Sequence, residues 1–286
     1  MKIPQSFVPE KNLEIMRKIK TEMFRLVVTE SCNAKCKYCL AANTPKNGSN
    51  QTIEAVEKAA KKAKENGARE ASISGGEPTL DKNLLKKIKV VGKYFDKINL
   101  QTNGTLLENP EDYKLAGVTT VIINLPSYDK ETYEKLVGIK VYDKVINNII
   151  RATLAGLNVR LNSVLVKGYT DDFAHIVRMI EFSKKLGLRE ITFTQMVPAN
   201  DFAAKHRVGL ENVRQLFQRS EQNENQKFHS IDVFQFLDMT IGLSSCPFEL
   251  NGQAFETGWS KEYVLTEDSR LITDYFNQER STMEVF

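Results

Sequence analysis

Residues 32–39 read Cys-Asn-Ala-Lys-Cys-Lys-Tyr-Cys and hold three of the chain's four cysteines at the spacing C-x3-C-x2-C. Thiolates are soft ligands, and thiolates clustered on one loop are typical of zinc sites or iron–sulfur clusters. Three ligands leave a fourth coordination position open, which favours a reactive metal over a closed structural site. The alternatives are a zinc knuckle and three buried thiols. A zinc knuckle usually brings a second pair of closely spaced cysteines, and this sequence has no second pair.

The composition is that of an ordinary globular protein, with 41% hydrophobic and 27% charged residues among 286. This length allows one α/β barrel domain or two smaller domains. The net charge of +4 is too small to indicate nucleic-acid binding. The sequence has no apolar run near the roughly 18 residues of a membrane span, no signal-peptide pattern and no disulfide framework. These features predict a cytoplasmic protein with neither a membrane nor a nucleic-acid partner.

A repeated order of strand, loop and amphipathic helix extends outward from the cysteines. A glycine separates each helical pattern from the next strand at Gly67, Gly117, Gly156 and Gly187. Strands are expected at residues 24–29, 71–74, 97–101, 119–124, 158–164 and 190–196. Six strands alternating with helices predict a parallel α/β sheet. Right-handed crossovers would curl that sheet into a partial (β/α)6, TIM-like barrel.

Each expected strand carries polar side chains on one face. An ordinary eight-stranded barrel fills its interior with branched aliphatic side chains. The polar faces therefore predict an open lumen that receives a polar ligand, unless these positions lie at strand ends, where polarity costs little. The residues on the polar faces are Arg25, Ser72, Ser74, Asn99, Gln101, Arg160, Asn162, Thr192 and Thr194.

The turn Gly75-Gly76-Glu77-Pro78 directly follows the second expected strand. Glycines let a ligand approach the backbone closely, and the Glu77 carboxylate can pair with an ammonium group. A plain tight turn explains a lone Gly-Gly-Glu equally well, so the turn alone does not decide between a binding role and a structural role.

Together, the cysteine spacing, the aromatic Tyr38 before the last cysteine and this turn resemble the radical S-adenosylmethionine (SAM) superfamily. The resemblance implies that Cys32, Cys36 and Cys39 hold a [4Fe-4S] cluster and that SAM binds its open iron. It also implies that the turn holds the amino group of SAM. The activity so implied is reductive cleavage of SAM, followed by hydrogen abstraction from a substrate by a 5'-deoxyadenosyl radical.

From about Arg25 to Pro198 the sequence is similar to the GTP 3',8-cyclase family of molybdenum-cofactor biosynthesis. The segments that carry this similarity are residues 102–107, 123–125, 160–164 and 193–198. It implies that Arg25 and Arg160 contact the substrate, and that the family's third basic substrate position falls on Ser72, where that contact is lost. The implied SAM-binding residues are Tyr38, Gly75, Gly76, Glu77, Pro78, Thr102, Asn103, Asn124, Asn162 and Val197.

The resemblance ends near residue 200. The cyclase family carries three further cysteines there for a second cluster, whereas this chain has only Cys246, so GTP cyclisation is not expected. The expected division is an N-terminal covering segment at residues 1–20, the radical SAM partial barrel at 21–204 and a variable, substrate-specific C-terminal cap at 205–286. Cys246 is either a small buried hydrophobe, a leftover ligand or a hydrogen-atom donor facing the SAM site.

The sequence thus predicts a radical SAM enzyme that acts on a polar, anionic small molecule or nucleotide, because guanidinium groups suit oxyanions. One alternative is a ribosomal-peptide-modifying radical SAM enzyme, an epimerase or a crosslinking enzyme. Another is a non-catalytic [4Fe-4S] electron-transfer protein, which would have no use for an amino-acid-binding turn. The expected reductant is a flavodoxin- or ferredoxin-type protein.

Overall fold

The computed structural model describes residues 21–40, 51–220, 226–228, 231–244, 261–265, 270–272 and 284–285. The covering segment expected at residues 1–20 and the Cys246 side chain lie outside these ranges, so both stay predictions.

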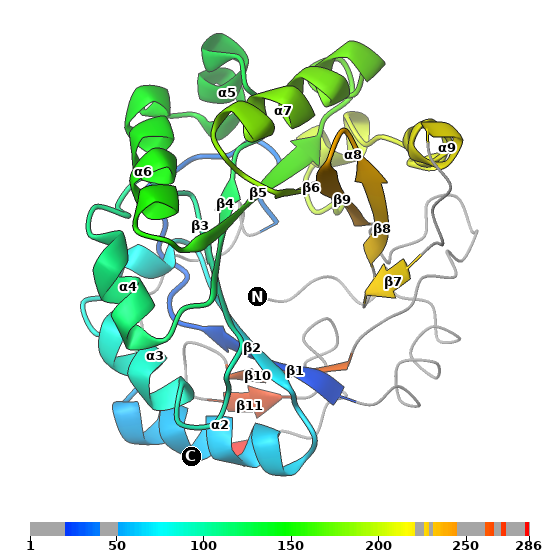
Figure 1. Ribbon diagram of the computed structural model, residues 1–286. Helices are drawn as coiled ribbons and strands as arrows, with labels where there is room; N and C mark the ends of the chain where they lie inside the picture. The colour runs from blue at the N-terminus through cyan, green and yellow to red at the C-terminus, as the bar shows by residue number, and fades with distance from the viewer. Residues whose placement is uncertain are drawn as a thin grey trace.

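Six parallel strands in chain order form the wall of a partial barrel, as the sequence predicts (Figure 1). They are β1 (Thr21–Val27), β2 (Glu70–Ser74), β3 (Ile98–Thr102), β4 (Thr120–Asn124), β5 (Asn158–Leu165) and β6 (Glu190–Gln195). β1 ends before Thr29, the expected last residue, because the chain beyond Val27 bonds to the end of β2 and the turn after it. The Val28 N–H donates to the Ser74 carbonyl, and the Thr29 carbonyl accepts from the Gly76 N–H.

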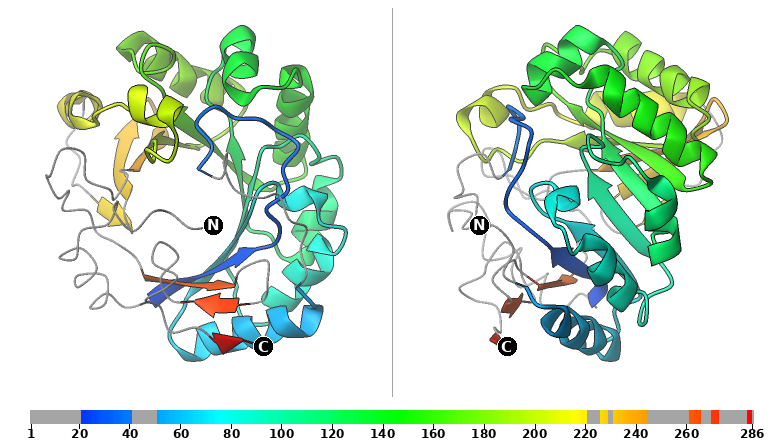
Figure 2. Two further views of the ribbon diagram at one scale, coloured as in Figure 1. Left: turned by 180° about the vertical axis from the view of Figure 1, so that it is seen from behind. Right: turned by 90° about the vertical axis from the view of Figure 1, so that its left-hand side faces the viewer.

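Helices cover the outer face of the curved sheet (Figures 1 and 2). They are α2 (Ile53–Glu65), α3 (Leu84–Val91), α4 (Pro110–Ala116), α5 (Lys130–Val137), α6 (Tyr142–Leu154), α7 (Phe173–Lys185), α8 (Asp201–Lys205) and α9 (Glu211–Ser220), with the short 3-10 helix η2 (Pro78–Leu80). Side-chain caps begin several of them: Asp129 accepts from the Thr132 N–H at α5, and Asp172 accepts from the His175 N–H at α7. Gly117 ends α4 in the left-handed conformation, with φ of 112°.

Strands from the C-terminal part of the chain extend both edges of this sheet. β9 (Met239–Ser244) lies parallel to β6, and β10 (Lys261–Leu265) lies parallel to β1. The remaining strands are β7 (Gln226–Phe228) and β8 (Ile231–Phe236) beyond β9, and β11 (Arg270–Ile272) and β12 (Glu284–Val285) beyond β10. The described strands after residue 205 therefore belong to the barrel sheet. A cap role for residues 205–286 stays a prediction.

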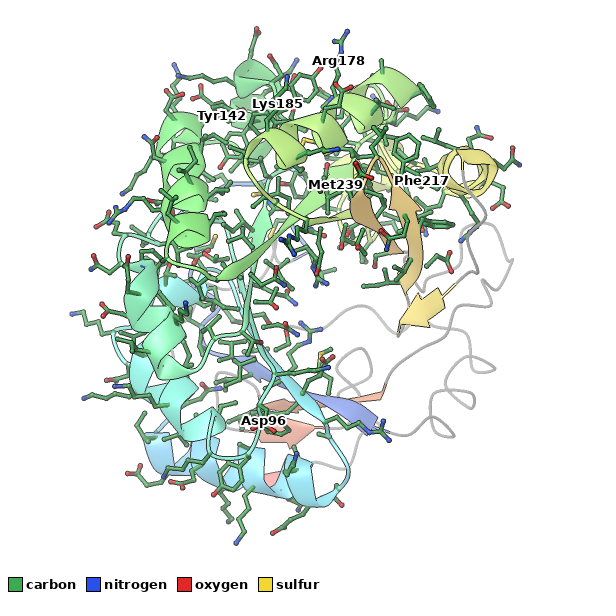
Figure 3. The ribbon with its side chains drawn as sticks, viewed as in Figure 1. Asp96, Tyr142, Arg178, Lys185, Phe217 and Met239 are labelled. Atoms are coloured by element: carbon green, nitrogen blue, oxygen red, sulfur yellow. The ribbon has the colours of Figure 1, made fainter. Side chains whose placement is uncertain are left out.

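The hydrophobic core lies between the outer face of the sheet and the helices. Phe24 of β1 is fully buried and stacks on Phe95 with 5.8 Å between ring centroids. Phe217 of α9 is buried with Met239 of β9, whereas Arg178 points outward from α7 (Figure 3). Apolar side chains thus fill the space outside the sheet, and the inner face is left to other residues.

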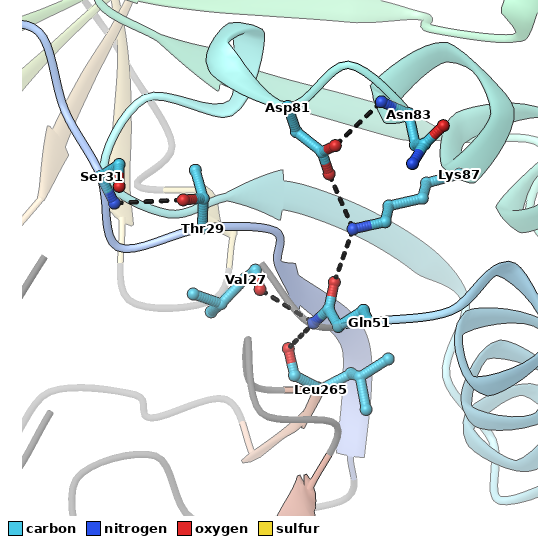
Figure 4. Close-up of polar contacts among 8 residues, drawn as sticks. All are labelled: Val27, Thr29, Ser31, Gln51, Asp81, Asn83, Lys87 and Leu265. Carbon is cyan, nitrogen blue, oxygen red and sulfur yellow. Dashed lines mark hydrogen bonds and ion pairs between the residues drawn. The ribbon is translucent and has the colours of Figure 1, made fainter. Parts of the chain in front are cut away.

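Gln51, just before α2, joins the neighbouring strands β1 and β10 near the cysteine loop (Figure 4). Its Nε2 donates to the carbonyls of Val27 at 2.9 Å and Leu265 at 3.5 Å, and its Oε1 accepts from Lys87 Nζ at 3.2 Å. Lys87 also pairs with Asp81 at 2.7 Å, where the two side chains are 1% and 9% exposed. This buried polar network fastens β10 beside β1, directly before the cysteine loop.

Candidate functional site

A cavity of about 990 Å³ occupies the inside of the barrel. The strand positions expected to face the lumen line the wall of this cavity, together with apolar side chains such as Ile122 and Val233. That the lumen receives a polar ligand stays a prediction. The predicted residues on this wall are Arg25, Ser72, Ser74, Asn99, Gln101, Arg160, Asn162, Thr192 and Thr194. At the carboxyl ends of the strands the same cavity meets Cys32, Cys36 and Cys39. One space therefore joins the cysteine loop to the lumen.

Two helices hold the cysteine loop in place. The N–H groups of Lys35 and Lys37 donate to the carbonyls of Val137 and Leu136 at the end of α5, at 3.0 and 2.9 Å. The Asn200 side chain caps α8 and donates to the Cys39 carbonyl at 3.1 Å. Figure 2 shows the loop, in blue, arching from β1 toward α8, in yellow. These bonds fix the loop through its backbone and do not use the three thiol groups.

The three cysteines are half-buried free thiols. Burial, together with the charges of the neighbouring Cys39 and Cys32, raises the pKa of Cys36 to about 12. Among the described residues, no group of three or more His, Cys, Asp or Glu side chains converges closely enough to hold one metal ion. A [4Fe-4S] cluster makes a different demand, because each cysteine binds a different iron, and its positive irons favour the thiolate form.

Gly75 and Gly76 lie against the chain that enters the cysteine loop. The Gly76 N–H donates to the Thr29 carbonyl at 2.6 Å, and the Glu77 N–H donates to the Ser31 carbonyl at 2.8 Å. A Cβ on Gly75 or Gly76 would come within 2.3 Å of a backbone oxygen of this chain. The sequence predicts close approach by a ligand; the structure adds that the glycines also admit the cysteine loop itself.

The Glu77 side chain turns away from the lumen and is fully buried. Its carboxylate accepts hydrogen bonds from Thr102 Oγ1 at 2.6 Å, from the Asn103 N–H at 2.7 Å and from Thr79. Burial raises the pKa of Glu77, and these hydrogen bonds oppose the rise. Glu77 thus ties the glycine turn to the end of β3. A contact between this carboxylate and the SAM amino group stays a prediction.

An amide network behind the first cysteine includes residues that the sequence analysis missed. Asn103 Nδ2 donates to Asn33 Oδ1 at 2.8 Å and lies 4.0 Å from Cys32 Sγ. Asn33 donates in turn to Thr105 Oγ1 at 2.8 Å. Asn33 stands inside the cysteine motif and Thr105 three residues beyond Thr102, so both lay within reach of sequence reasoning, although their pairing across some 70 residues did not.

Some of the other predicted SAM-binding residues line the cavity, and others do not. Asn124 Nδ2 donates to the Tyr38 hydroxyl at 2.7 Å, which joins the lumen wall to the cysteine loop. Asn162 also lines the lumen, where its Oδ1 accepts from Thr194 Oγ1 at 2.5 Å. Val197 is half-buried just after β6 and does not line the cavity, and Pro78 is buried in η2.

The predicted substrate residues share the lumen with two carboxylates that the sequence analysis missed. Glu190 pairs in register with Arg160 across β5 and β6, and Glu70 begins β2. Burial lowers the pKa of Arg160, and the charges of Glu190 and Glu70 oppose that fall. Ser72 accepts from Gln101 Nε2 at 3.0 Å. This part of the lumen, near the amino ends of the strands, therefore carries both signs of charge.

The profile of the radical SAM superfamily matches residues 26–182, which is more than half of the chain. The chain belongs to the radical SAM superfamily. Among curated proteins, the probable GTP 3',8-cyclase of Pyrococcus abyssi is 32% identical over 57% of this chain and 53% of its own length. The GTP 3',8-cyclase of Aliarcobacter butzleri is 33% identical over 64% of this chain and 59% of its own length. The chain thus spans about half the length of these relatives.

Solved structures of radical SAM proteins share the fold. Streptococcus suis SuiB bound to S-adenosylmethionine has a TM-score of 0.70 at 16% identity and covers 96% of this chain and 65% of its own. The structure titled native anSMEcpe with bound AdoMet has a TM-score of 0.57 at 16% identity and covers 89% of this chain and 74% of its own. At this identity the likeness supports the partial barrel and nothing more specific.

Membership in the radical SAM superfamily makes this protein an enzyme whose cofactors are a [4Fe-4S] cluster and SAM. The residues present fit both groups. Cys32, Cys36 and Cys39 supply thiolates on an anchored loop, and the backbone at Gly75 and Gly76 faces the same cavity. No helix among the described residues is long and apolar enough to cross a membrane.

Proposed function

We propose that this enzyme cleaves SAM reductively and uses the resulting radical to remove hydrogen from a polar small molecule or nucleotide that carries an anionic group. The observation that carries the proposal is that one continuous cavity has the three cysteines at one end and Arg25 and Arg160 on its wall. A substrate in this lumen would lie directly next to the SAM site. Guanidinium groups bind oxyanions through charge-assisted hydrogen bonds that are often bidentate.

The bound cofactors supply one-electron cleavage of SAM to methionine and a 5'-deoxyadenosyl radical. The chain's own residues position the cofactors and the substrate and shield them from water. Cys32, Cys36 and Cys39 hold the cluster, while the backbone at Gly75 and Gly76 and the lumen amides of Asn124 and Asn162 bind and orient SAM. Arg25 and Arg160 hold the substrate's anionic group. Glu77 acts by fixing the glycine turn, because its hydrogen-bond partners lie within the protein.

GTP cyclisation is not part of the proposal, despite the similarity to GTP 3',8-cyclases. That similarity covers about half the length of those proteins, and beyond residue 200 this sequence has one cysteine, Cys246. One cysteine cannot supply three cluster ligands. From the sequence alone we also propose that Cys246 donates a hydrogen atom. We propose likewise that the protein works in a reducing, cytoplasmic compartment, which suits its thiols.

The test is anaerobic reconstitution of the cluster, followed by dithionite reduction and measurement of 5'-deoxyadenosine and methionine from SAM. We expect about four irons per chain from the single cysteine triad and formation of 5'-deoxyadenosine. Cys36→Ala, the matched control, should give neither. A wild-type protein that holds its cluster and still leaves SAM intact would overturn the proposal, and roughly eight irons per chain would overturn the single cluster.

Peptide modification is the second candidate, and the lumen carboxylates favour it. Glu70 and Glu190 stand near Arg160, so this part of the lumen could bind ammonium or amide donors of a peptide as well as an anion. A fold shared with SuiB does not decide the matter. Stimulation of 5'-deoxyadenosine formation by short peptides, with no response to nucleotides or phosphorylated small molecules, would favour this candidate over the first.

A further inference from the structure

A basic and aromatic surface lies on the outside of the barrel, beside the cysteine loop. It includes a hollow of about 390 Å³, whose lining includes Lys135 from α5 and Lys167 and Tyr169 from the loop after β5. His206, just after α8, and Glu131 also line it. The two helices that border this hollow, α5 and α8, are the helices that hold the cysteine loop. The hollow and the cluster ligands therefore share one support.

Stacked rings connect the hollow to the cysteine loop. Phe202 stacks on His206 with 4.4 Å between centroids, and Tyr169 lies 5.6 Å from His206. Lys37, which stands between Cys36 and Cys39, places its Nζ 5.8 Å from the centroid of Phe202. Lys135 Nζ lies 5.1 Å from the centroid of Tyr169. These cation–π contacts hold two ammonium groups over the rings.

Ion pairs neutralise some lysines of the described chain and leave others unpaired. Lys93, Lys130 and Lys144 each form an ion pair with a carboxylate. Lys37, Lys135 and Lys167 are exposed, and the salt bridges found among the described residues include none of them. Glu131 is the acidic residue lining the hollow. Lys86 and Lys89 of α3 also lie outside these salt bridges, so the distinguishing feature of this surface is its aromatic contacts. Lys37 and Lys135 lie over rings beside the cysteine loop.

We propose that this surface docks an acidic one-electron carrier protein of the flavodoxin or ferredoxin type. The proposal rests on the proposed function, because SAM cleavage needs an electron from outside the enzyme. One electron passes from the carrier's reduced flavin or iron–sulfur group to the oxidised cluster. The carrier is thereby oxidised by one electron, and no atom is transferred. SAM and the substrate are proposed to bind on the lumen side of the cysteine loop, so the carrier must approach the loop from its outer side.

Charge complementarity of this kind mainly raises the rate of encounter and makes it depend on salt. Electron-transfer complexes are small and short-lived, so a few lysines around a shallow hollow suffice. The rings add apolar contact area at the centre of the basic surface. A rigid loop favours this task, because the distance between the carrier and the cluster is then fixed by α5 and α8.

The direct test is equilibrium binding of an acidic flavodoxin to the reconstituted enzyme at low ionic strength. The variant is Lys135→Glu with Lys167→Glu, since both side chains lie outside the cysteine loop and the lumen. We expect the affinity to fall roughly tenfold. The difference should nearly vanish at about 1 M salt, where the screening length is ~3 Å. The affinity of the Lys135→Gln, Lys167→Gln variant should lie between those of the wild type and the glutamate variant.

The matched control is Lys86→Glu with Lys89→Glu. Both are exposed lysines of α3, which lies on the opposite side of the helix ring from α8 (Figure 1). The control should bind flavodoxin like the wild type. The docking surface would be overturned if both variants weakened flavodoxin binding equally. It would also be overturned if the wild-type enzyme bound neither flavodoxin nor an acidic ferredoxin.

Cluster reduction by reduced flavodoxin, followed spectroscopically without SAM, gives a second readout. The Lys135→Glu, Lys167→Glu enzyme should be reduced roughly tenfold more slowly than wild type, while dithionite should reduce both at the same rate. Dithionite-driven SAM cleavage tests the proposed function separately. If dithionite-driven SAM cleavage fails although the wild-type enzyme binds flavodoxin normally, the proposed SAM cleavage is overturned. If SAM cleavage is normal but flavodoxin reduces the variant as fast as the wild type, the docking surface is overturned.

Discussion

The cysteine end of the barrel is held by main-chain hydrogen bonds, whereas the opposite end of its lumen is formed by side chains. Main-chain bonds hold the cysteine end, such as those from the Gly76 N–H to Thr29 and from the Lys35 N–H to Val137. Side chains on strand faces, such as Arg160 and Glu190, form the lumen end. A site held by main-chain bonds is sensitive to an added Cβ, whereas a site made of side chains can change its ligand and keep the fold. The difference assigns the shared chemistry to one end and substrate choice to the other.

Gly76→Ala is the most severe way to break the cysteine end. The added Cβ would lie 2.3 Å from the Ser31 carbonyl oxygen and 2.5 Å from that of Glu30, so the loop entrance must move. We expect iron after reconstitution to fall from about four per chain toward zero, measured by iron and sulfide analysis. Gly209→Ala is the control, because its Cβ would meet open space. Full iron content in Gly76→Ala would show that this close backbone packing is not needed.

Lys87→Met tests whether the buried network of Figure 4 supports the cysteine end. The change leaves the buried Asp81 carboxylate and the Gln51 amide oxygen without their ammonium partner. Removing one partner of a buried ion pair costs about 3–5 kcal/mol. Urea unfolding measures the free energy of unfolding, and adding Asp81→Asn should restore part of it. Lys93→Met, at an exposed pair, should change stability little. Similar losses at both sites would contradict a buried support.

Arg160→Met sharpens the comparison from the lumen end. The loss of one charge-assisted hydrogen-bonding group costs about 1.5–3 kcal/mol, which corresponds to roughly 10- to 150-fold in affinity for an anion. Titration with GTP and inorganic triphosphate measures this affinity. Affinity for SAM and dithionite-driven SAM cleavage should stay unchanged, and Arg160→Lys should lose less. A collapse of SAM affinity, or equal anion binding by both proteins, would remove Arg160 from the substrate site.

The sequence was informative wherever its signal was local. The alternation of Ser72, Ile73 and Ser74 predicts which side chains face the lumen, because strand faces follow a period of two. The cysteine spacing and the glycine turn each lie within a few residues, and the resemblance that they carry to the radical SAM superfamily predicts the cofactors.

Contacts that depend on distant pairing were not predictable. The Glu77 side chain is buried away from the lumen because Thr102 and Asn103, more than twenty residues away, donate hydrogen bonds to its carboxylate. Glu190 lies beside Arg160 because of the register between β5 and β6, which no local pattern fixes. The joining of β9 and β10 to opposite sheet edges is likewise a property of the whole chain.

Tyr38→Phe should have the smallest effect, and it tests the bond that joins the two ends. The Tyr38 hydroxyl accepts from Asn124 Nδ2 at 2.7 Å, so the change leaves a lumen amide without this acceptor. A neutral hydrogen bond contributes about 1 kcal/mol, and we expect the dissociation constant for SAM to rise roughly fivefold, with iron content unchanged.

Asn124→Ala and the double variant complete a mutant cycle for this bond. If the bond positions SAM, the double variant should weaken SAM binding no more than the larger single change, because the second substitution has nothing left to remove. Fully additive losses would mean that Tyr38 and Asn124 act on SAM independently. The cysteine end and the lumen would then be two separate modules, and the main-chain bonds of the loop alone would set where SAM lies relative to the substrate.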